Sequence, residues 1–132
     1  MNKPVIQCIG LFKSYDDVAA VRNLDLAVDK NEILVLLGPS GCGKTTALRL
    51  IAGFESPDAG VLEVEGQVMA GPTLHVPPER RRIGMVFQEY ALFPHLNVES
   101  NVEFGLSRGS RRKERIQEVL QLVGLQGLEN RM

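Results

Sequence analysis

The residues best suited to chemistry lie in a glycine-rich stretch that runs from Gly38 to Thr45. This stretch matches the pattern G-x-x-x-x-G-K-[ST] at every fixed position, through Gly38, Gly43, Lys44 and Thr45. Glycines allow successive main-chain N–H groups to turn inward, and a helix that follows directs its positive N-terminal end at the same place. Because such a loop binds polyphosphate mainly through its main chain, the pattern predicts a nucleoside triphosphate as ligand.

Three side chains add to this loop. Lys44 supplies a point charge that can reach the β- and γ-phosphates, and the Thr45 hydroxyl is placed to ligate Mg²⁺. Thr46 offers one more hydroxyl or N–H donor. The pattern also arises by chance in unrelated sequences, but here it follows an apolar segment and opens a helix, as the chemistry requires. We therefore expect Mg-ATP to bind at Gly38, Pro39, Ser40, Gly41, Cys42, Gly43, Lys44, Thr45 and Thr46.

Two elements must position the loop. The segment Ile33 to Leu37 is apolar on both faces, which predicts a central strand buried between layers. Residues 45–52 favour a helix with Leu48, Ile51 and Ala52 on one face, and Gly53 is placed to end it in a left-handed turn.

Alternating patterns predict a second, antiparallel layer around this core. The first thirty residues read as strands joined by turns, since Leu24, Leu26 and Val28 alternate with polar or small residues. Residues 61–68 alternate again and should return to the same ribbon. Residues 83–87 form a further strand candidate that ends at Gln88.

Helices are predicted nearer the C-terminus. Asn97 can cap a short helix, with an acidic residue in its first turn. A second helix carries a stripe at i, i+3, i+4 and i+7, formed by Ile116, Val119, Leu120 and Val123.

Composition narrows the function classes. The chain has 132 residues, 44% of them hydrophobic, which suits one globular domain. Its 15 basic residues are balanced by 16 acidic residues, so it has no overall positive charge to attract nucleic acid, and we expect no nucleic-acid partner. The apolar runs are too short to cross a bilayer and the N-terminus lacks a signal-peptide core, so we expect a cytoplasmic protein. Cys8 and Cys42 indicate a reducing compartment, and isolated His75 and His95 indicate no metal site built by the protein alone.

Beyond the phosphate loop, the chain resembles the N-terminal half of an ATP-binding subunit of an ABC transporter, over essentially all of its residues. Residues 77–82 and the segment after Gln88 are most similar to importers for iron(III), polyamines, sulfate or sugars. Four segments carry the resemblance: Phe12-Lys13-Ser14-Tyr15, Gly38 to Thr46, Arg82-Ile83-Gly84-Met85-Val86-Phe87-Gln88, and Ala91-Leu92-Phe93-Pro94-His95-Leu96-Asn97-Val98.

The resemblance implies an α/β fold: a partial P-loop NTPase core with an N-terminal antiparallel β ribbon and the start of a helical subdomain. We expect a single truncated domain over residues 1–132. Its parts would be 1–32 and 54–70 as mainly antiparallel β, 33–53 and 83–88 as the core, and 89–132 as the Q-loop and the start of the helical subdomain.

Two further site residues follow from the resemblance. Tyr15 would stack on adenine, with Val18 nearby, although by itself a strand tyrosine is more often a core residue. Gln88 would be the Q-loop glutamine, which touches Mg²⁺ or the attacking water. It would therefore act in catalysis together with Lys44 and in metal binding together with Thr45. By itself, a glutamine at a strand end is usually only solvated.

The apolar segment from Tyr90 to Leu96 either folds inward as a small satellite core or forms a docking surface. The resemblance favours docking: transmembrane permease subunits would bind through residues 89–105, and a second ATP-binding subunit would form a homodimer. The protein would then be peripheral on the inner face of the cell membrane. Residues 80–82, and the basic residues between 108 and 115, read as solvated surface.

Hydrolysis requires more groups than the sequence holds. No apolar strand ending in Asp-Glu follows the phosphate loop, and the family's signature motif and switch histidine are also absent. By the resemblance the complete protein is a transport ATPase, whereas we expect this chain alone to be catalytically inactive and to associate through an exposed edge at Ile33 to Leu37. A soluble ABC ATPase of DNA repair or translation, or a fragment that only binds nucleotide, remain alternatives.

Overall fold

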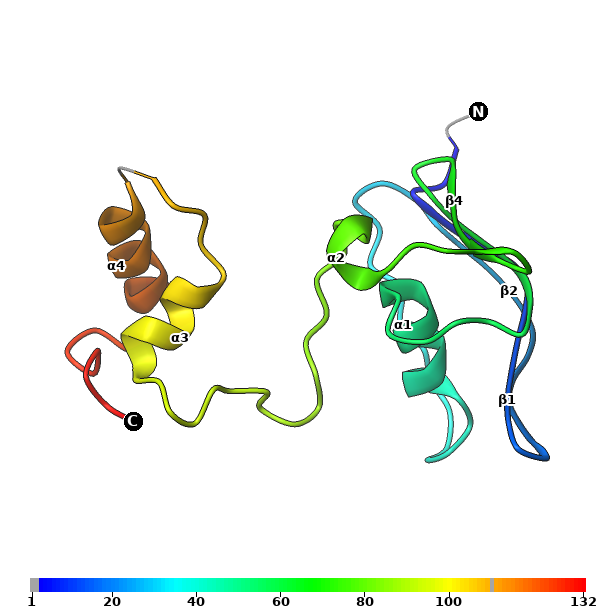
Figure 1. The fold of residues 1–132 in the computed structure, drawn as a ribbon, viewed down its shortest axis with the longest axis horizontal. Helices are drawn as coiled ribbons and strands as arrows, with labels where there is room; N and C mark the ends of the chain where they lie inside the picture. The colour runs from blue at the N-terminus through cyan, green and yellow to red at the C-terminus, as the bar shows by residue number, and fades with distance from the viewer. Residues whose placement is uncertain (1–2, 110) are drawn as a thin grey trace. The chain divides into compact units, whose positions relative to one another are not determined.

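The computed structural model describes residues 3–109 and 111–132, which form two compact units (Figure 1). One unit extends to Met85 and the other runs from Val86 to Met132. Met1, Asn2 and Ser110, which the predicted domain includes, lie outside the described residues. Within the described ranges, every helix is too short or too polar to cross a membrane.

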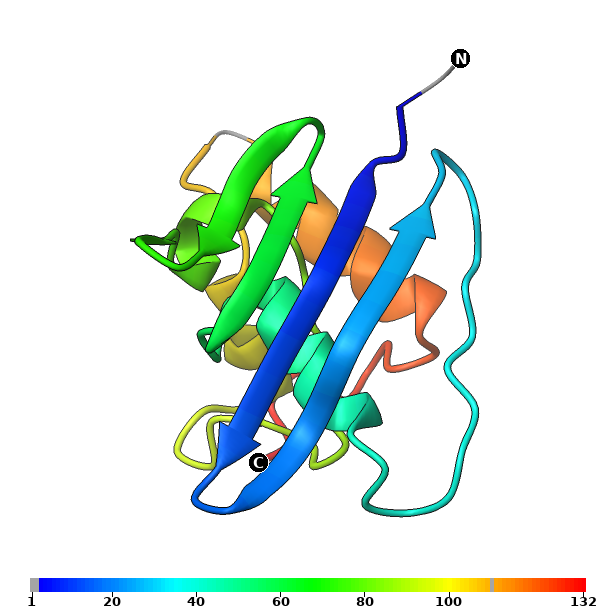
Figure 2. The same ribbon diagram turned by 90° about the vertical axis from the view of Figure 1, so that its right-hand side faces the viewer.

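The first unit is built on an antiparallel sheet of five strands in the order β2-β1-β3-β4-β5 (Figure 2). In the closing hairpin, Tyr15 lies opposite Val18, and at the other end of β1 Ile6 pairs with Val28 and Val64. The antiparallel ribbon predicted from the alternating patterns is confirmed. The strands are β1 (Ile6–Tyr15), β2 (Val18–Val28), β3 (Ala59–Val64), β4 (Gln67–Gly71) and β5 (Leu74–His75).

Helix α1 (Lys44–Ala52) covers one face of this sheet, and Gly53 ends it with φ 93°, as predicted (Figure 2). The buried helix face consists of Ala47, Leu50, Ile51 and Ala52. Leu48 was predicted on this face and is 49% exposed instead. Ala47, Leu50 and Ile51 stand at i, i+3 and i+4, which turns Leu48 about a quarter of a turn away from the sheet. The sheet contributes Cys8, Leu11, Leu62 and Ala70 to the core.

Residues 61–68 return to the antiparallel ribbon, as predicted, and form a hairpin within it. Strand β3 ends at Val64 and β4 begins at Gln67. Glu65 and Gly66, between them, have φ values of 50° and 75°. Positive φ at both central residues is the mark of a two-residue hairpin turn whose twist matches that of the flanking strands.

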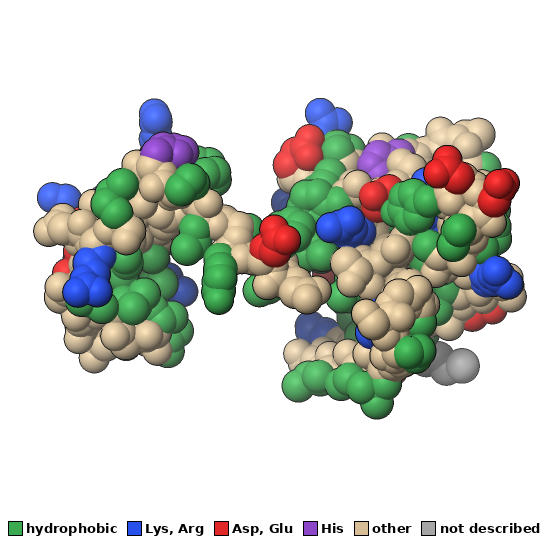
Figure 3. Space-filling model, turned by 90° about the horizontal axis from the view of Figure 1, so that it is seen from below, with side chains coloured by type: hydrophobic (Ala, Val, Ile, Leu, Met, Phe, Trp, Pro, Cys, Tyr) green, Lys and Arg blue, Asp and Glu red, His purple; other side chains and the backbone are tan. Residues whose placement is uncertain are grey.

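Neither of the two predicted core strands forms. Residues 33–37 and 83–87 belong to no strand of the described structure, and Ile33 and Leu37 are 90% and 87% exposed. In Figure 2 the cyan segment leaves β2 and returns to α1 without joining the sheet, and Figure 3 shows green hydrophobic side chains at the surface. The prediction of a buried central strand is therefore wrong for this structure. A strand needs backbone partners on its edges, and apolar side chains alone do not supply them.

Short helices complete both units. In the first, α2 (Pro78–Arg81) follows β5; in the second, α3 (Val98–Phe104) and α4 (Arg112–Leu122) pack together through a 2.9 Å ion pair between Glu103 and Arg112. The predicted cap is confirmed, because Asn97 Oδ1 accepts a hydrogen bond from the N–H of Ser100 at 2.9 Å. Of the predicted stripe on α4, Ile116 and Leu120 are buried, whereas Val123 is exposed where the helix ends.

Candidate functional site

The glycine loop leads directly into the N-terminus of α1. Gly43 is the N-cap residue, with φ 96°, and no side chain caps the helix start. The first turn carries no acidic residue. The first N–H groups of a helix have no partner within it and carry a partial positive charge, so this end of α1 is suited to bind an anion.

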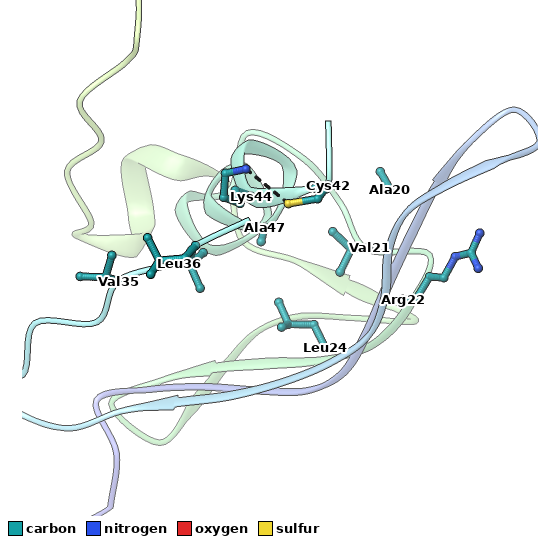
Figure 4. Close-up of a pocket in the computed structure, with 11 residues that line it drawn as sticks. Ala20, Val21, Arg22, Leu24, Val35, Leu36, Cys42, Lys44 and Ala47 are labelled. Atoms are coloured by element: carbon teal, nitrogen blue, oxygen red, sulfur yellow. Dashed lines mark hydrogen bonds between the residues drawn. The ribbon is translucent and has the colours of Figure 1, made fainter. Parts of the chain in front are cut away.

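Lys44 folds over the loop that precedes it. Its Nζ donates to the carbonyl oxygens of Gly38 at 2.8 Å and Pro39 at 2.6 Å, and it lies 3.3 Å from Cys42 Sγ (Figure 4). The two carbonyl acceptors carry no net charge. Because a phosphate oxygen carries negative charge, it attracts the ammonium group more strongly than a carbonyl oxygen does and would compete effectively for it.

The base of the loop rests directly on β2. A Cβ atom added to Gly43 would lie 2.0 Å from the carbonyl oxygen of Ala20, so only glycine fits there. Beneath the loop, a hollow of about 310 Å³ lies between β2 and residues 35–37, and Figure 4 shows Val21 and Leu36 among its lining side chains. Its lining combines aliphatic side chains with Arg22, Gly43 and Lys44, so the hollow adjoins the loop that is expected to bind phosphate.

Hard ligands for a divalent cation are sparse in the loop itself. Thr45 is exposed and Thr46 half-buried, and no three His, Cys, Asp or Glu side chains converge anywhere in residues 3–109 and 111–132. A Mg²⁺ ion characteristically binds through one or two protein oxygens together with phosphate oxygens and water. The Thr45 hydroxyl is compatible with that arrangement when a triphosphate is present.

Tyr15 ends β1 on the same unit, and its side chain is 41% exposed. Burial and then the Glu55 carboxylate raise the pKa of Tyr15, while a hydrogen bond with Thr46 and the charge of Lys13 act in the opposite direction. Thr46, in the first turn of α1, therefore lies near the Tyr15 hydroxyl. Val18, also predicted near the base, is exposed and lies opposite Tyr15 in the hairpin.

A family model described as ABC transporter matches residues 21–132, which is most of the chain. The chain belongs to the ABC transporter family. It is 50% identical over 131 residues to the spermidine/putrescine import ATP-binding protein of Acetivibrio thermocellus, covering 96% of this chain and 36% of that protein. It is 51% identical over 117 residues to the Fe(3+) ions import ATP-binding protein of Mesorhizobium japonicum, covering 88% and 32%. The chain therefore spans about a third of the length of these relatives.

Solved structures agree with this assignment. A dimeric bacterial ABC transporter cassette is similar at a TM-score of 0.80 and 26% identity, over 96% of this chain and 60% of that one. A dimeric ATP-binding cassette in a post-hydrolysis state, bound to ADP and Pi, gives a TM-score of 0.79 at 26% identity, with the same coverage. This ABC transporter chain thus has the cassette fold that the sequence resemblance implied.

Two residues outside the glycine loop differ in exposure: Gln88 is exposed, whereas Arg81 is buried. Gln88 is exposed in the second unit of the ABC transporter chain, and its contact with Mg²⁺ stays a prediction. Arg81 was read as a solvated loop residue, and this is wrong, because it is only 2% exposed. Its Nη1 donates to the carbonyls of Leu50 at 2.7 Å and Ile51 at 3.0 Å, at the C-terminal end of α1. No sequence pattern distinguished it from its arginine neighbours.

The two cysteines of the ABC transporter chain should differ strongly in reactivity. Cys8 is buried and Cys42 exposed, and burial, followed by the charge of Asp25, raises the pKa of Cys8 from 9.0 to about 11. At mildly alkaline pH the thiolate fraction of Cys8 is then about a hundredfold below that of an unperturbed cysteine. We expect iodoacetamide to modify Cys42 first, as mapped by peptide mass spectrometry, with Cys8 reacting only in urea or near pH 11. Equal labelling of both in the folded protein would contradict this.

Proposed function

We propose that this chain binds Mg-ATP at Gly38 to Thr46, as part of the ATP-hydrolysing subunit that energises solute import by an ABC transporter. The observation that carries the proposal is the uncapped N-terminus of α1, with the Lys44 ammonium folded over the loop in front of it. The import ATP-binding proteins among its relatives support the proposed role in transport.

Each site residue has a role in this proposal. The loop N–H groups and Lys44 hold the β- and γ-phosphates, Thr45 ligates Mg²⁺, and Thr46 adds a donor. Tyr15 stacks on adenine with Val18 beside it, and Gln88 reaches Mg²⁺ or the attacking water. When bound, Mg²⁺ would be held by Thr45 and would supply positive charge that offsets the charge of the phosphates. Because the 132 residues hold no carboxylate pair after an apolar strand, we expect this chain alone to bind ATP with negligible turnover.

The experiment that tests nucleotide binding is Lys44→Ala. Losing hydrogen bonds from a charged donor costs about 1.5–3 kcal/mol, so the affinity for Mg-ATP, measured by isothermal titration calorimetry, should fall about tenfold to a hundredfold. Lys30→Ala, which removes an exposed lysine from the turn after β2, is the matched control and should leave affinity unchanged. If both variants bind Mg-ATP as tightly as the unaltered chain, the proposed site is wrong.

The segment from Tyr90 to Leu96 supports the proposed permease partner. Phe93 packs against Phe104 with ring centroids 4.3 Å apart, and Asn101 Nδ2 donates to the carbonyls of Phe93 at 3.2 Å and Leu96 at 2.9 Å. This fixes the backbone while leaving Tyr90 and Leu92 exposed beside an apolar hollow of about 270 Å³. A rigid, exposed apolar surface is typical of a docking site.

We propose that residues 89–105 dock on transmembrane permease subunits, and that a second ATP-binding subunit completes a homodimer peripheral to the inner face of the membrane. Leu92→Asp should abolish co-purification with integral membrane subunits, because a buried unpaired charge is strongly unfavourable at such an interface. Glu114→Gln, a change at an exposed position of α4 outside residues 89–105, is the control. Purification of the unaltered protein without any membrane subunit would favour a soluble ABC ATPase.

A further inference from the structure

The end of β1 is tied down by Asp58, a residue of the turn before β3. Its Oδ2 accepts hydrogen bonds from the N–H of Ser14 at 2.8 Å and from Ser14 Oγ at 3.1 Å, and its Oδ1 pairs with Lys13 Nζ at 3.1 Å. The backbone N–H of Asp58 donates to the carbonyl of Phe12 at 2.9 Å. The bond from Ser14 N–H, and then that from Lys13, lower the pKa of Asp58. The carboxylate therefore stays ionised at neutral pH.

The lysine held in this way lies against the aromatic ring two residues further along. Lys13 Nζ is 5.4 Å from the centroid of the Tyr15 ring, within the range of a cation–π interaction. The Lys13 side chain is only 15% exposed, whereas Tyr15 is an exposed residue. At the other end of the ring, Glu55 and Thr46 lie near enough to the Tyr15 hydroxyl to influence its pKa.

The neighbours of the Tyr15 ring lie over one face and around the hydroxyl. Lys13 lies over the ring, and Glu55 and Thr46 lie near the hydroxyl. Tyr15 is nevertheless 41% exposed, so its ring can receive another flat group. A π-face without demands for particular hydrogen bonds suits a stacked base.

We propose that Asp58 and Lys13 are positioning residues that orient the Tyr15 ring so that the ring receives the base of the bound nucleotide. This inference rests on the proposed function, because it presumes that Tyr15 stacks on the base. Neither positioning residue touches the ligand. Their effect is on the base alone, and the phosphate loop operates independently of them.

The test compares a ligand that has a base with one that lacks it. Mg-ATP and Mg-tripolyphosphate are titrated against the unaltered chain and against Lys13→Met and Asp58→Asn. Loss of an ordered cation–π contact and a looser ring should weaken Mg-ATP about threefold to tenfold, while tripolyphosphate affinity changes less than twofold. Lys30→Met, at an exposed turn lysine, should change neither.

Fluorescence gives a readout that a purely structural role would not alter. The chain has two tyrosines and no tryptophan, so Tyr90→Phe leaves Tyr15 as the sole fluorophore of its kind. In that background we expect ATP, and not tripolyphosphate, to quench Tyr15 emission, with weaker quenching after Lys13→Met.

The outcomes separate the two proposals. Equal loss of affinity for both ligands in Lys13→Met and Asp58→Asn would mean a general structural role and would overturn this inference. Unchanged ATP affinity and quenching in both variants would overturn it as well, while leaving nucleotide binding intact. If the unaltered chain bound neither ligand, the proposed function itself would be wrong.

Discussion

Arg81→Met should lower the free energy of unfolding of the first unit by about 3 kcal/mol, because it removes a charged donor from buried backbone acceptors. The guanidinium donates to Leu50 and Ile51 at the end of α1, to Val76 O at 2.6 Å and to Met69 O at 3.3 Å. Burial lowers the pKa of Arg81, yet the arginine stays protonated at neutral pH. Methionine keeps the apolar stem and leaves these carbonyls without their partner. Urea unfolding followed by far-ultraviolet circular dichroism measures the change.

The neighbouring arginine provides the control for this experiment. Arg80 is exposed, so Arg80→Met should change the free energy of unfolding by no more than about 0.5 kcal/mol. Arg81→Lys should fall between the two, since an ammonium group cannot reproduce the planar fork of a guanidinium. Similar losses at positions 80 and 81 would show that Arg81 does not anchor α1.

Gly43→Ala should abolish nucleotide binding, with an affinity loss of at least about a hundredfold, corresponding to about 3 kcal/mol. The added methyl group would lie 2.0 Å from the Ala20 carbonyl oxygen, and φ 96° is unfavourable for alanine. The chain can relieve this overlap only by moving the start of α1 away from β2. That movement displaces the N–H groups and Lys44 from the geometry that binds phosphate. Calorimetric titration with Mg-ATP and Mg-tripolyphosphate measures the loss.

Gly41→Ala is the matched control for steric overlap. Its φ of 80° is also left-handed, but a Cβ atom there meets nothing within 4 Å. Both variants incur the same backbone penalty of about 1–2 kcal/mol in unfolding experiments, and only Gly43→Ala adds the contact with β2. Equal destabilisation by the two variants would contradict the proposed packing of the loop on the sheet.

Gly43 and Arg81 act on opposite ends of α1. Gly43 allows the N-terminus of α1 to approach β2, and Arg81 fixes its C-terminal carbonyls to the segment after the sheet. The loop sequence supplies the phosphate-binding groups. The position of those groups depends on how α1 is held at both ends.

Local features could be predicted from the sequence because their causes are local. The glycine pattern with Lys44, the helix stop at Gly53 and the cap at Asn97 each depend on residues within a few positions of one another. The alternation along Leu24, Leu26 and Val28 likewise follows from the two-residue repeat of a strand with one buried face.

What depends on distant parts of the chain was decided only by the tertiary structure. Residues 33–37 have the composition of a buried strand, but a strand exists only where another backbone satisfies its edge, and the described structure provides none there. Arg81 has the same local sequence character as Arg80, and its burial depends on carbonyls about thirty residues earlier in the chain. Tyr15 acquires its neighbours Glu55 and Thr46, which are distant in the sequence, in the same way. The local preferences of residues predict helices and strands, whereas side-chain burial and strand pairing depend on the whole fold.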